Sequence, residues 1–394
     1  FMTVCFILIT IGIIWLLIDY ILSYFNSNVP KEKNNKGKFA ILIPARDESR
    51  VIEELLNSIL NQTRKIDSDD VYVIVEEESD KTVELVKNKN MNIVFRHDLS
   101  KKRKGYALDD AIKEILEQKK HYDAYFIFDA DNVLDKDYIK NMEEAYEDGY
   151  DIGIGYRNTK NGNDSVIAAA SSLTFSMINT LGNEHKTKCN NTLTISGTGF
   201  YIKGDIVEKL SGYPFNSLTE DYELTLYATL NDLTTTYVKN AIFFDEQPVK
   251  YNITINQRTR WIKGFFEARK KYIPLLLKKE INKNFSSSFH QIMGVTPYIL
   301  LIIGLLGILL INYFNVKNTI ILILFVYLIM VLITSIMVLK ENTYLNINNK
   351  MKIKVILYNP IFLTTYIICL FKAILNKDVK WLKIEHSKSL DTSV

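Results

Sequence analysis

Long apolar runs near both ends of this 394-residue chain constrain its fold more than any other feature. One run covers residues 1–25, and two more cover residues 294–312 and 319–339. Each approaches the ~20 residues that an α-helix needs to cross the hydrocarbon core of a bilayer. We therefore expect three transmembrane helices. The segment between the first two, residues 36–250, has ordinary globular composition and is long enough for one substantial α/β core.

The first run has two interpretations. It lacks the basic start and the small-residue cleavage site of a secretory signal peptide, which favours a retained membrane anchor. Asp19 lies near the end of this run and is expected at the membrane interface rather than in a functional role inside the membrane.

Lysine and arginine residues gather beside the apolar runs. They follow the first run (Lys31, Lys33, Lys36, Lys38), precede the second (Lys263, Arg269, Lys270, Lys271, Lys278, Lys279) and follow the third (Lys340, Lys350, Lys352, Lys354). Because basic loops stay on the cytoplasmic side, all three groups are expected there. We predict a multi-pass protein of the cell membrane, with its globular domain in the cytoplasm and residues 312–318 outside.

The last apolar stretch, residues 355–375, is interrupted by Asn359, Pro360 and Lys372. The tail after it, residues 376–394, carries several lysines and is expected in the cytoplasm. A crossing would place this tail outside. A broken or in-plane segment with both ends in the cytoplasm is therefore favoured over a transmembrane helix.

Short apolar strands alternate with amphipathic helices in the first part of the globular segment. Strands are expected at 39–44, 71–75, 92–96 and 124–128, and helices at 49–60, 81–89 and 105–118. This alternation predicts an α/β domain with a mostly parallel sheet and helices on both faces. Ligands of such sheets bind beyond the carboxyl ends of the strands, so residues 45–48, 76–80 and 129–132 are the first site candidates.

Residues 251–280 form a basic, amphipathic segment that leads into the second apolar run. We expect its later part to lie on the membrane surface, and an ordinary core helix is the alternative.

Three short clusters follow one another in this framework: Asp129-Ala130-Asp131, Thr219-Glu220-Asp221 and Gln257-Arg258-Thr259-Arg260-Trp261. Each alone is weak evidence. The first cluster is also typical of a solvated turn, the second of a helix N-terminus, and the tryptophan of the third of a membrane-interface anchor. Together, in this order and spacing, they resemble the membrane-integrated family 2 glycosyltransferases, which include cellulose, chitin, hyaluronan and poly-N-acetylglucosamine synthases. The resemblance covers residues 39–277 well, and the flanking runs in architecture. It implies a GT-A type nucleotide-binding domain.

The resemblance also implies roles for these residues. Asp131 coordinates Mg²⁺ or Mn²⁺, and Asp129 contacts the nucleotide and can share the metal. Asp221 is the catalytic base, with Glu220 as its partner. Arg260 holds the diphosphate, and Gln257 and Trp261 lie at the acceptor end. The other residues at substrate-binding positions are Ala45, Arg46, Glu48, Glu76, Lys104, Gly197, Thr198, Gly199 and Arg258.

Three features depart from the usual pattern of the family, one of which is that Lys104 precedes Gly105 where the family has Gly before Lys. Glu76 stands where an Asp commonly reads the nucleobase or ribose, and Asp109 stands where an Asn is usual. Glu76 keeps the carboxylate but adds a methylene group, which leaves the choice of nucleoside open.

We therefore expect an inverting, metal-dependent glycosyltransferase that moves sugar from a nucleotide sugar, with UDP-sugar favoured, onto a growing β-linked polysaccharide at the membrane. The nearest alternative is a non-processive enzyme that glycosylates a membrane lipid. An inactive, sugar-nucleotide-sensing membrane scaffold is a third, but Asp129, Asp131, Asp221 and Arg260 are all intact. Because so few spans make only a narrow pore, a homodimer or an accessory membrane protein is expected to assist export. No nucleic-acid partner is expected.

Overall fold

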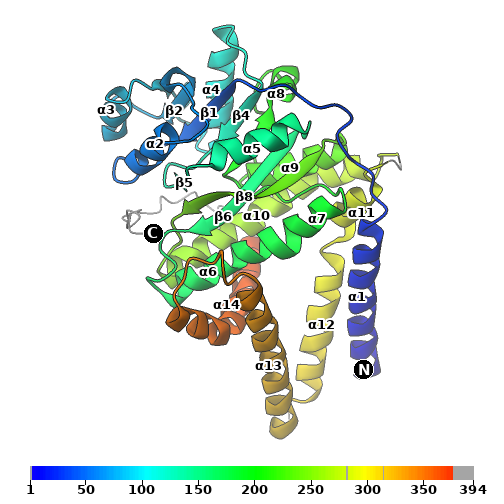
Figure 1. Ribbon diagram of the computed structural model, residues 1–394. Coiled ribbons are helices and arrows are strands. Elements are labelled where there is room, and N and C mark those ends of the chain that lie inside the picture. Colours follow the sequence, from blue (N-terminus) through cyan, green and yellow to red (C-terminus); the bar gives the residue numbers. More distant parts are fainter. Residues whose placement is uncertain (1, 281–282, 314, 376–394) are drawn as a thin grey trace.

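The computed structural model describes residues 2–280, 283–313 and 315–375 of the chain. They form a globular α/β part and a group of long helices that projects from it (Figure 1). The predicted cytoplasmic tail, residues 376–394, lies outside the described residues.

Within the described residues, eight strands form one sheet in the order β3-β2-β1-β4-β7-β6-β8-β5. Their bounds are β1 Phe39–Pro44, β2 Val71–Val75, β3 Asn92–Phe95, β4 Ala124–Ile127, β5 Val133–Leu134, β6 Ile152–Thr159, β7 Phe200–Lys203 and β8 Thr235–Asp245. Only β7 and β5 run against the other strands. The predicted α/β fold with a mostly parallel sheet is therefore confirmed.

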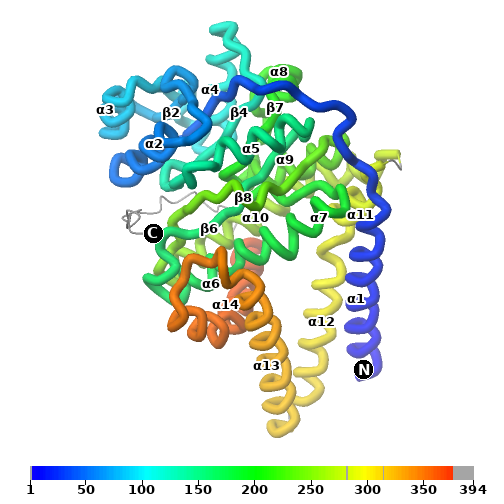
Figure 2. Tube along the Cα trace, in the orientation of Figure 1, coloured from blue at the N-terminus to red at the C-terminus, as the bar shows by residue number. Residues whose placement is uncertain are grey.

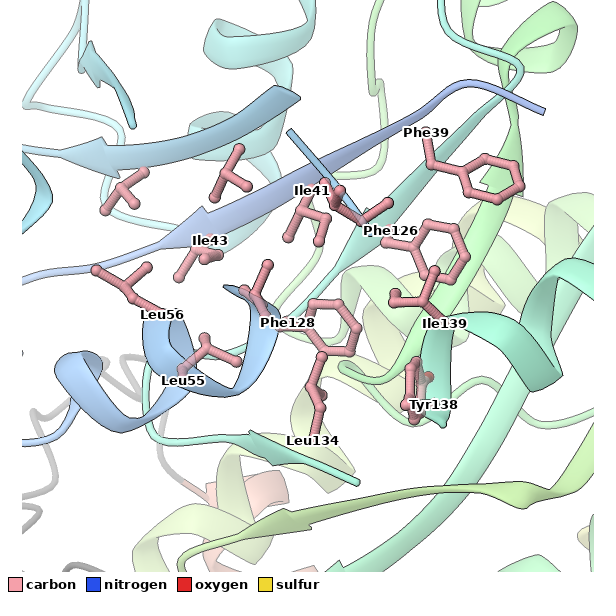
Figure 3. Close-up of a cluster of buried hydrophobic side chains, with 14 of the residues drawn as sticks. Phe39, Ile41, Ile43, Leu55, Leu56, Phe126, Phe128, Leu134, Tyr138 and Ile139 are labelled. Atoms are coloured by element: carbon pink, nitrogen blue, oxygen red, sulfur yellow. The ribbon is translucent and has the colours of Figure 1, made fainter. Parts of the chain in front are cut away.

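Alternate residues of the central strands supply two separate cores, because successive side chains of a strand point to opposite faces. Figure 3 shows one face, where β1 and β4 side chains meet α2 (Ile52–Leu60) and α5 (Tyr138–Glu147). The other face packs on α4 (Lys104–Glu117). Both faces of β1 and β4 are buried, which explains why these strands read as continuous apolar runs.

Further helices complete the globular part: α3 Lys81–Lys87, α6 Val166–Met177, α7 Glu184–Lys188, α8 Gly204–Leu210, α9 Glu220–Leu230, α10 Tyr251–Leu276 and α11 Phe285–Met293, with a 3-10 helix at Ser68–Asp70. A π-helical stretch, η2 (Ile178–Asn183), joins α6 to α7. The long helix α10 packs against α9 on one side of the sheet.

Four helices in the described part of the chain are long and apolar enough to cross a membrane. They are α1 (Met2–Ser23), the stretch Phe285–Ile311 that contains α11 and α12 (Thr296–Ile311), α13 (Val316–Lys340) and α14 (Asn349–Leu375). Figure 2 shows α1 and α12 side by side, and α13 also extending away from the sheet. In contrast, α14 packs against α6 and α10, and it continues through Pro360 without a break in the helix.

Hydrogen bonds between polar side chains connect the long helices to one another and to the globular part. Asp19 of α1 lies 2.7 Å from His290 of α11. The carboxylate of Glu341, at the end of α13, is completely buried and accepts hydrogen bonds from Tyr156 at 2.7 Å and Ser176 at 3.0 Å. These contacts join α13 to β6 and α6, the two elements that form one side of the cavity described next.

Candidate active site

A cavity of about 550 Å³ opens at one edge of the sheet. Residues that follow β1, β2, β3 and β4 line it, together with the end of β8 and the residues that precede the antiparallel β7. All of these chain ends meet at the same edge, the edge where ligands of parallel sheets bind. Strand β6 and helices α4, α6, α9, α10 and α14 form the remaining walls. The volume is typical of a site for a small ligand or cofactor.

Asp129 and Asp131 follow β4 and line this cavity. The carboxylate of Asp129 pairs with the ammonium group of Lys104. The carboxylate of Asp131 accepts the backbone N–H of Glu246 at 3.1 Å and the side-chain amide of Asn132 at 3.2 Å. Both carboxylates are therefore held in position by neighbours from other parts of the chain.

The described residues contain no group of three or more His, Cys, Asp or Glu side chains that could hold a metal ion. Two carboxylates alone still fit Mg²⁺ or Mn²⁺, because these ions commonly take one or two protein carboxylates and complete their shell with water and phosphate oxygens. Asp129 and Asp131 therefore suit a metal that arrives with a diphosphate.

Glu220 and Asp221 form the first turn of α9 and face the same cavity. Burial raises the pKa of Glu220 to about 7, and the neighbouring Asp221 adds to this, while Lys104 opposes it. Burial also raises the pKa of Asp221, against the N–H of Tyr222 and the cations Lys104, Arg157 and Arg260. The two carboxyl groups titrate as a pair, and one proton stays bound to the pair at a higher pH than usual.

Lys104 and Arg260 bring positive charge to the acidic groups. Burial disfavours the charged form of Lys104, but Asp129 and Glu220 outweigh this effect and its pKa is raised. Burial lowers the pKa of Arg260, and Glu220, Asp129 and Asp221 oppose that change. The cavity thus holds carboxylates and cations in close proximity, an arrangement that can bind phosphate groups and a divalent ion together.

The Ser-Gly-Thr-Gly stretch before β7 closes the cavity around these groups. The carbonyl oxygen of Gly197 accepts a hydrogen bond from Lys104 at 2.6 Å. Thr198 is fully buried, and its hydroxyl accepts the backbone N–H of Asp129 at 2.9 Å. Gly199 packs on Phe243, where a Cβ atom would come within 2.1 Å of the ring.

Most residues predicted for the site line the cavity. They are Ala45, Arg46, Glu48, Glu76, Lys104, Asp129, Asp131, Gly197, Glu220, Asp221, Gln257, Arg260 and Trp261. Three others are not among the lining residues. Thr198 and Gly199 lie behind the wall, and Arg258 is buried between α10 and α14.

Some residues of the cavity carry no sequence motif. Arg157, in β6, donates to Asp245 at 2.7 Å and to the carbonyl oxygen of Ser196 at 2.7 Å. Its guanidinium carbon lies 3.7 Å from the ring centre of Phe175. No strand was predicted at Ile152–Thr159, so no sequence signal singled out Arg157. Tyr366, of α14, also lines the cavity, and nothing near it in sequence pointed there.

Residues 36–264 match the family model described as Glycosyltransferase like family 2. The chain is 27% identical over 261 residues to the Bacillus subtilis (strain 168) protein named Probable glycosyltransferase YdaM. That match covers 61% of this chain and 59% of the relative, so the chain spans less than two thirds of the relative's length.

The fold is similar to that of the mannosyltransferase PcManGT from Pyrobaculum calidifontis, solved in complex with GDP-Man and Mn²⁺. The TM-score is 0.62 at 13% identity, and the match covers 96% of this chain and 99% of the other. At this identity the likeness establishes a shared fold, and it extends to the long helices because nearly the whole of both chains is matched.

Proposed function

This chain belongs to glycosyltransferase like family 2, and we propose that it transfers a sugar from a nucleotide sugar to an acceptor hydroxyl presented at a membrane. The observation that carries the proposal is one cavity that holds three kinds of group: the Asp129–Asp131 pair, the Glu220–Asp221 pair, and Arg260 with Trp261. A donor diphosphate, a reacting hydroxyl and an acceptor body need these three kinds of group side by side.

The donor diphosphate is proposed to lie between Lys104, Arg260 and the Asp129–Asp131 pair. Asp131 and Asp129 would hold Mg²⁺ or Mn²⁺, which, when bound, offsets the charge of the departing diphosphate. Arg260 and Lys104 supply further positive charge to the same oxygens. Glu76 and Arg46, which form an ion pair at 3.1 Å on the cavity wall, are placed for the nucleoside. A UDP-sugar is our proposed donor.

Asp221 is proposed to be the base. The acceptor oxygen forms a bond to the anomeric carbon while the bond from that carbon to the diphosphate oxygen breaks. The acceptor proton passes to the Asp221 carboxylate, and the nucleoside diphosphate leaves. A single displacement of this kind inverts the configuration at the anomeric carbon. The raised pKa of Asp221 strengthens it as a base relative to an exposed aspartate.

The packing of the long helices supports a membrane lipid as acceptor. Among the described residues, α12 packs along α1 and α13 packs on α14, and only 11% of the most apolar stretch of either α1 or α13 is buried. Helices arranged in this way do not surround a channel within one copy. A lipid needs no channel, because its chains stay in the bilayer while its polar end reaches the cavity.

An exported polysaccharide, the product favoured by the sequence, would need a homodimer or an accessory protein to complete a path. For the orientation, the basic residues that flank α1 and α13 support a cytoplasmic site.

The test is turnover by purified protein in nanodiscs. UDP-glucose, UDP-N-acetylglucosamine and GDP-mannose are offered with Mg²⁺ or Mn²⁺. The acceptors are dioleoylglycerol, octyl glucoside, a β-linked oligosaccharide and a total membrane-lipid extract. We expect acceptor-dependent release of nucleoside diphosphate from a UDP-sugar, a lipid bearing one added sugar by mass spectrometry, and an inverted anomeric configuration by NMR.

Other outcomes contradict defined parts of the proposal. Turnover of GDP-mannose but of no UDP-sugar would show that the proposed donor is wrong. Formation of polymer would show that the proposed lipid acceptor is wrong. No acceptor-dependent release with any pair would refute the transferase proposal as a whole.

A further inference from the structure

Helix α14 contributes a side chain to the active-site cavity although it is a candidate membrane helix. Tyr366 lines the cavity, as do Gln257 and Trp261 of α10 and Phe175 of α6. Of the groups proposed for the donor, Asp129 and Lys104 come from the sheet edge and the start of α4, and Arg260 comes from α10. Tyr366 therefore belongs to the helical side of the cavity.

The two faces of α14 differ in what they contact. One face is buried against α6, α10 and α13 through residues spaced three or four apart: Met351, Val355, Asn359, Phe362, Thr365, Cys369 and Ala373. The other face exposes large apolar side chains, including Ile361, Ile368 and Phe371. An apolar exposed face on a candidate membrane helix is expected to contact lipid. Tyr366 thus lies in a helix that separates the cavity from lipid.

Arg258 of α10 packs directly beneath Tyr366. Its side chain is 1% exposed, and its guanidinium carbon lies 4.7 Å from the Tyr366 ring centre and 4.1 Å from that of Phe362. Nη1 donates to the hydroxyl of Thr365 at 2.7 Å. No carboxylate of the described residues forms an ion pair with Arg258.

A buried cation without a carboxylate partner is costly, so what surrounds it must compensate. Here most of the compensating groups, two aromatic faces and the Thr365 hydroxyl, belong to a single stretch of α14, residues 362–366, while Nε donates to the carbonyl oxygen of Thr254 on α10 at 3.3 Å. The burial of Arg258 is therefore compensated chiefly while this stretch of α14 stays against α10. That requirement fixes the position of the Tyr366 ring in the cavity wall.

We propose that Tyr366 is an acceptor-binding residue and that Arg258 is a positioning residue that holds Tyr366 in place. The inference rests on the proposed function, and it names the wall at which a lipid-borne acceptor is recognised. The Tyr366 ring would contact the acceptor beside Trp261 and Gln257, and its hydroxyl can donate to or accept from an acceptor hydroxyl. Neither residue contributes to donor binding.

The experiment compares Tyr366→Ala and Tyr366→Phe with wild type in nanodiscs, using octyl glucoside and dioleoylglycerol as acceptors. We expect the acceptor KM of Tyr366→Ala to rise about tenfold, with affinity for nucleoside diphosphate within about twofold of wild type. Tyr366→Phe keeps the ring and should show a smaller rise. Tyr358→Ala is the matched control, because Tyr358 lies two turns earlier on α14 and outside the residues that line the cavity.

Arg258 is tested by its dependence on Tyr366. Arg258→Met should raise the acceptor KM of wild type, and Arg258→Lys should recover part of the loss because it restores the charge but not the planar stacking group. In the Tyr366→Ala background, Arg258→Met should cause little further loss, since a residue that acts through Tyr366 has nothing left to position. A purely structural role would lower folded yield equally in both backgrounds.

The outcomes separate the two proposals. Wild-type transfer combined with an unchanged acceptor KM in both Tyr366 variants overturns this inference and leaves the proposed function standing. Equal, additive losses from Arg258→Met in both backgrounds overturn the positioning role. Absence of transfer by wild type to every acceptor refutes the proposed function, and this inference with it.

Discussion

The backbone at Gly197 approaches Asp221 so closely that a Cβ atom on Gly197 would lie 3.2 Å from Oδ2 of Asp221. Gly197 also has φ of +82°, a conformation that L side chains rarely adopt. Two separate reasons thus require glycine beside the proposed base. Space next to the carboxylate is left for an acceptor oxygen.

The first prediction follows from this contact. Gly197→Ala should lower kcat by about tenfold or more and destabilise the fold by about 1–2 kcal/mol, because the new methyl group crowds Asp221 and strains the backbone. Turnover and thermal unfolding measure the two effects. Gly182→Ala is the control, since a Cβ there would have no atom within 4 Å beyond its chain neighbours and its own helix backbone, and its φ is not positive. Loss of activity in both variants alike would contradict the explanation.

A second prediction isolates the base. Asp221→Asn should reduce transfer by about three orders of magnitude or more while nucleoside diphosphate affinity stays within a few-fold of wild type. The amide keeps the side-chain shape, and its oxygen can still accept the N–H of Tyr222 that Asp221 accepts at 2.8 Å. Single-turnover assays and calorimetry give the two quantities. Near-normal turnover in a folded Asp221→Asn variant would remove Asp221 from the role of base.

The coupled Glu220–Asp221 pair predicts opposite effects of pH on activity and on stability. Transfer needs the ionised pair, so kcat should fall as pH drops below about 7. For stability, the folded state holds a proton on Glu220 up to about pH 7, whereas the unfolded chain releases it near 4.5. The folded state therefore binds more protons between these values, and its stability should decline as pH rises from about 4.5 to about 7.

Glu220→Gln tests whether Glu220 causes this pH dependence, because a glutamine side chain cannot ionise. Chemical unfolding of ligand-free protein should show a smaller decline in stability over the same pH interval than wild type. Identical pH dependence of stability in the two proteins would show that Glu220 ionises normally.

Much of the fold was predictable because its signals are local. Strands β1, β2 and β4 are buried on both faces, and all of β1 to β4 alternate with helices, so each apolar run predicts its own strand. The later strands were harder to predict. β6 pairs in parallel with β8, about 80 residues further along the chain, and β7 inserts between β4 and β6 in the opposite direction. No short-range pattern encodes such pairings.

The same difference applies to the site. Residues that belong to motifs at strand ends or at a helix start could be predicted to line the site, because ligands bind at the carboxyl edge of a parallel sheet. Arg157 and Tyr366 could not, since each reaches the cavity only through long-range packing of β6 and α14. Arg258 shows the converse. It stands inside a substrate-binding motif, yet the helix geometry of α10 turns it toward α14.

The final prediction concerns the metal. Asp131 accepts the N–H of Glu246, so alanine would remove a structural acceptor together with the charge. Asp131→Asn keeps an oxygen there and removes only the ionised group. Nucleoside diphosphate binding by wild type, measured by calorimetry, should weaken at least about tenfold when a chelator removes Mg²⁺ or Mn²⁺. In Asp131→Asn the affinity should already be low and should change little with chelator.

Asp137→Ala, outside the residues that line the cavity, should keep the full metal dependence. Equal affinity of wild type with and without metal would contradict a metal-assisted diphosphate site between Asp129 and Asp131.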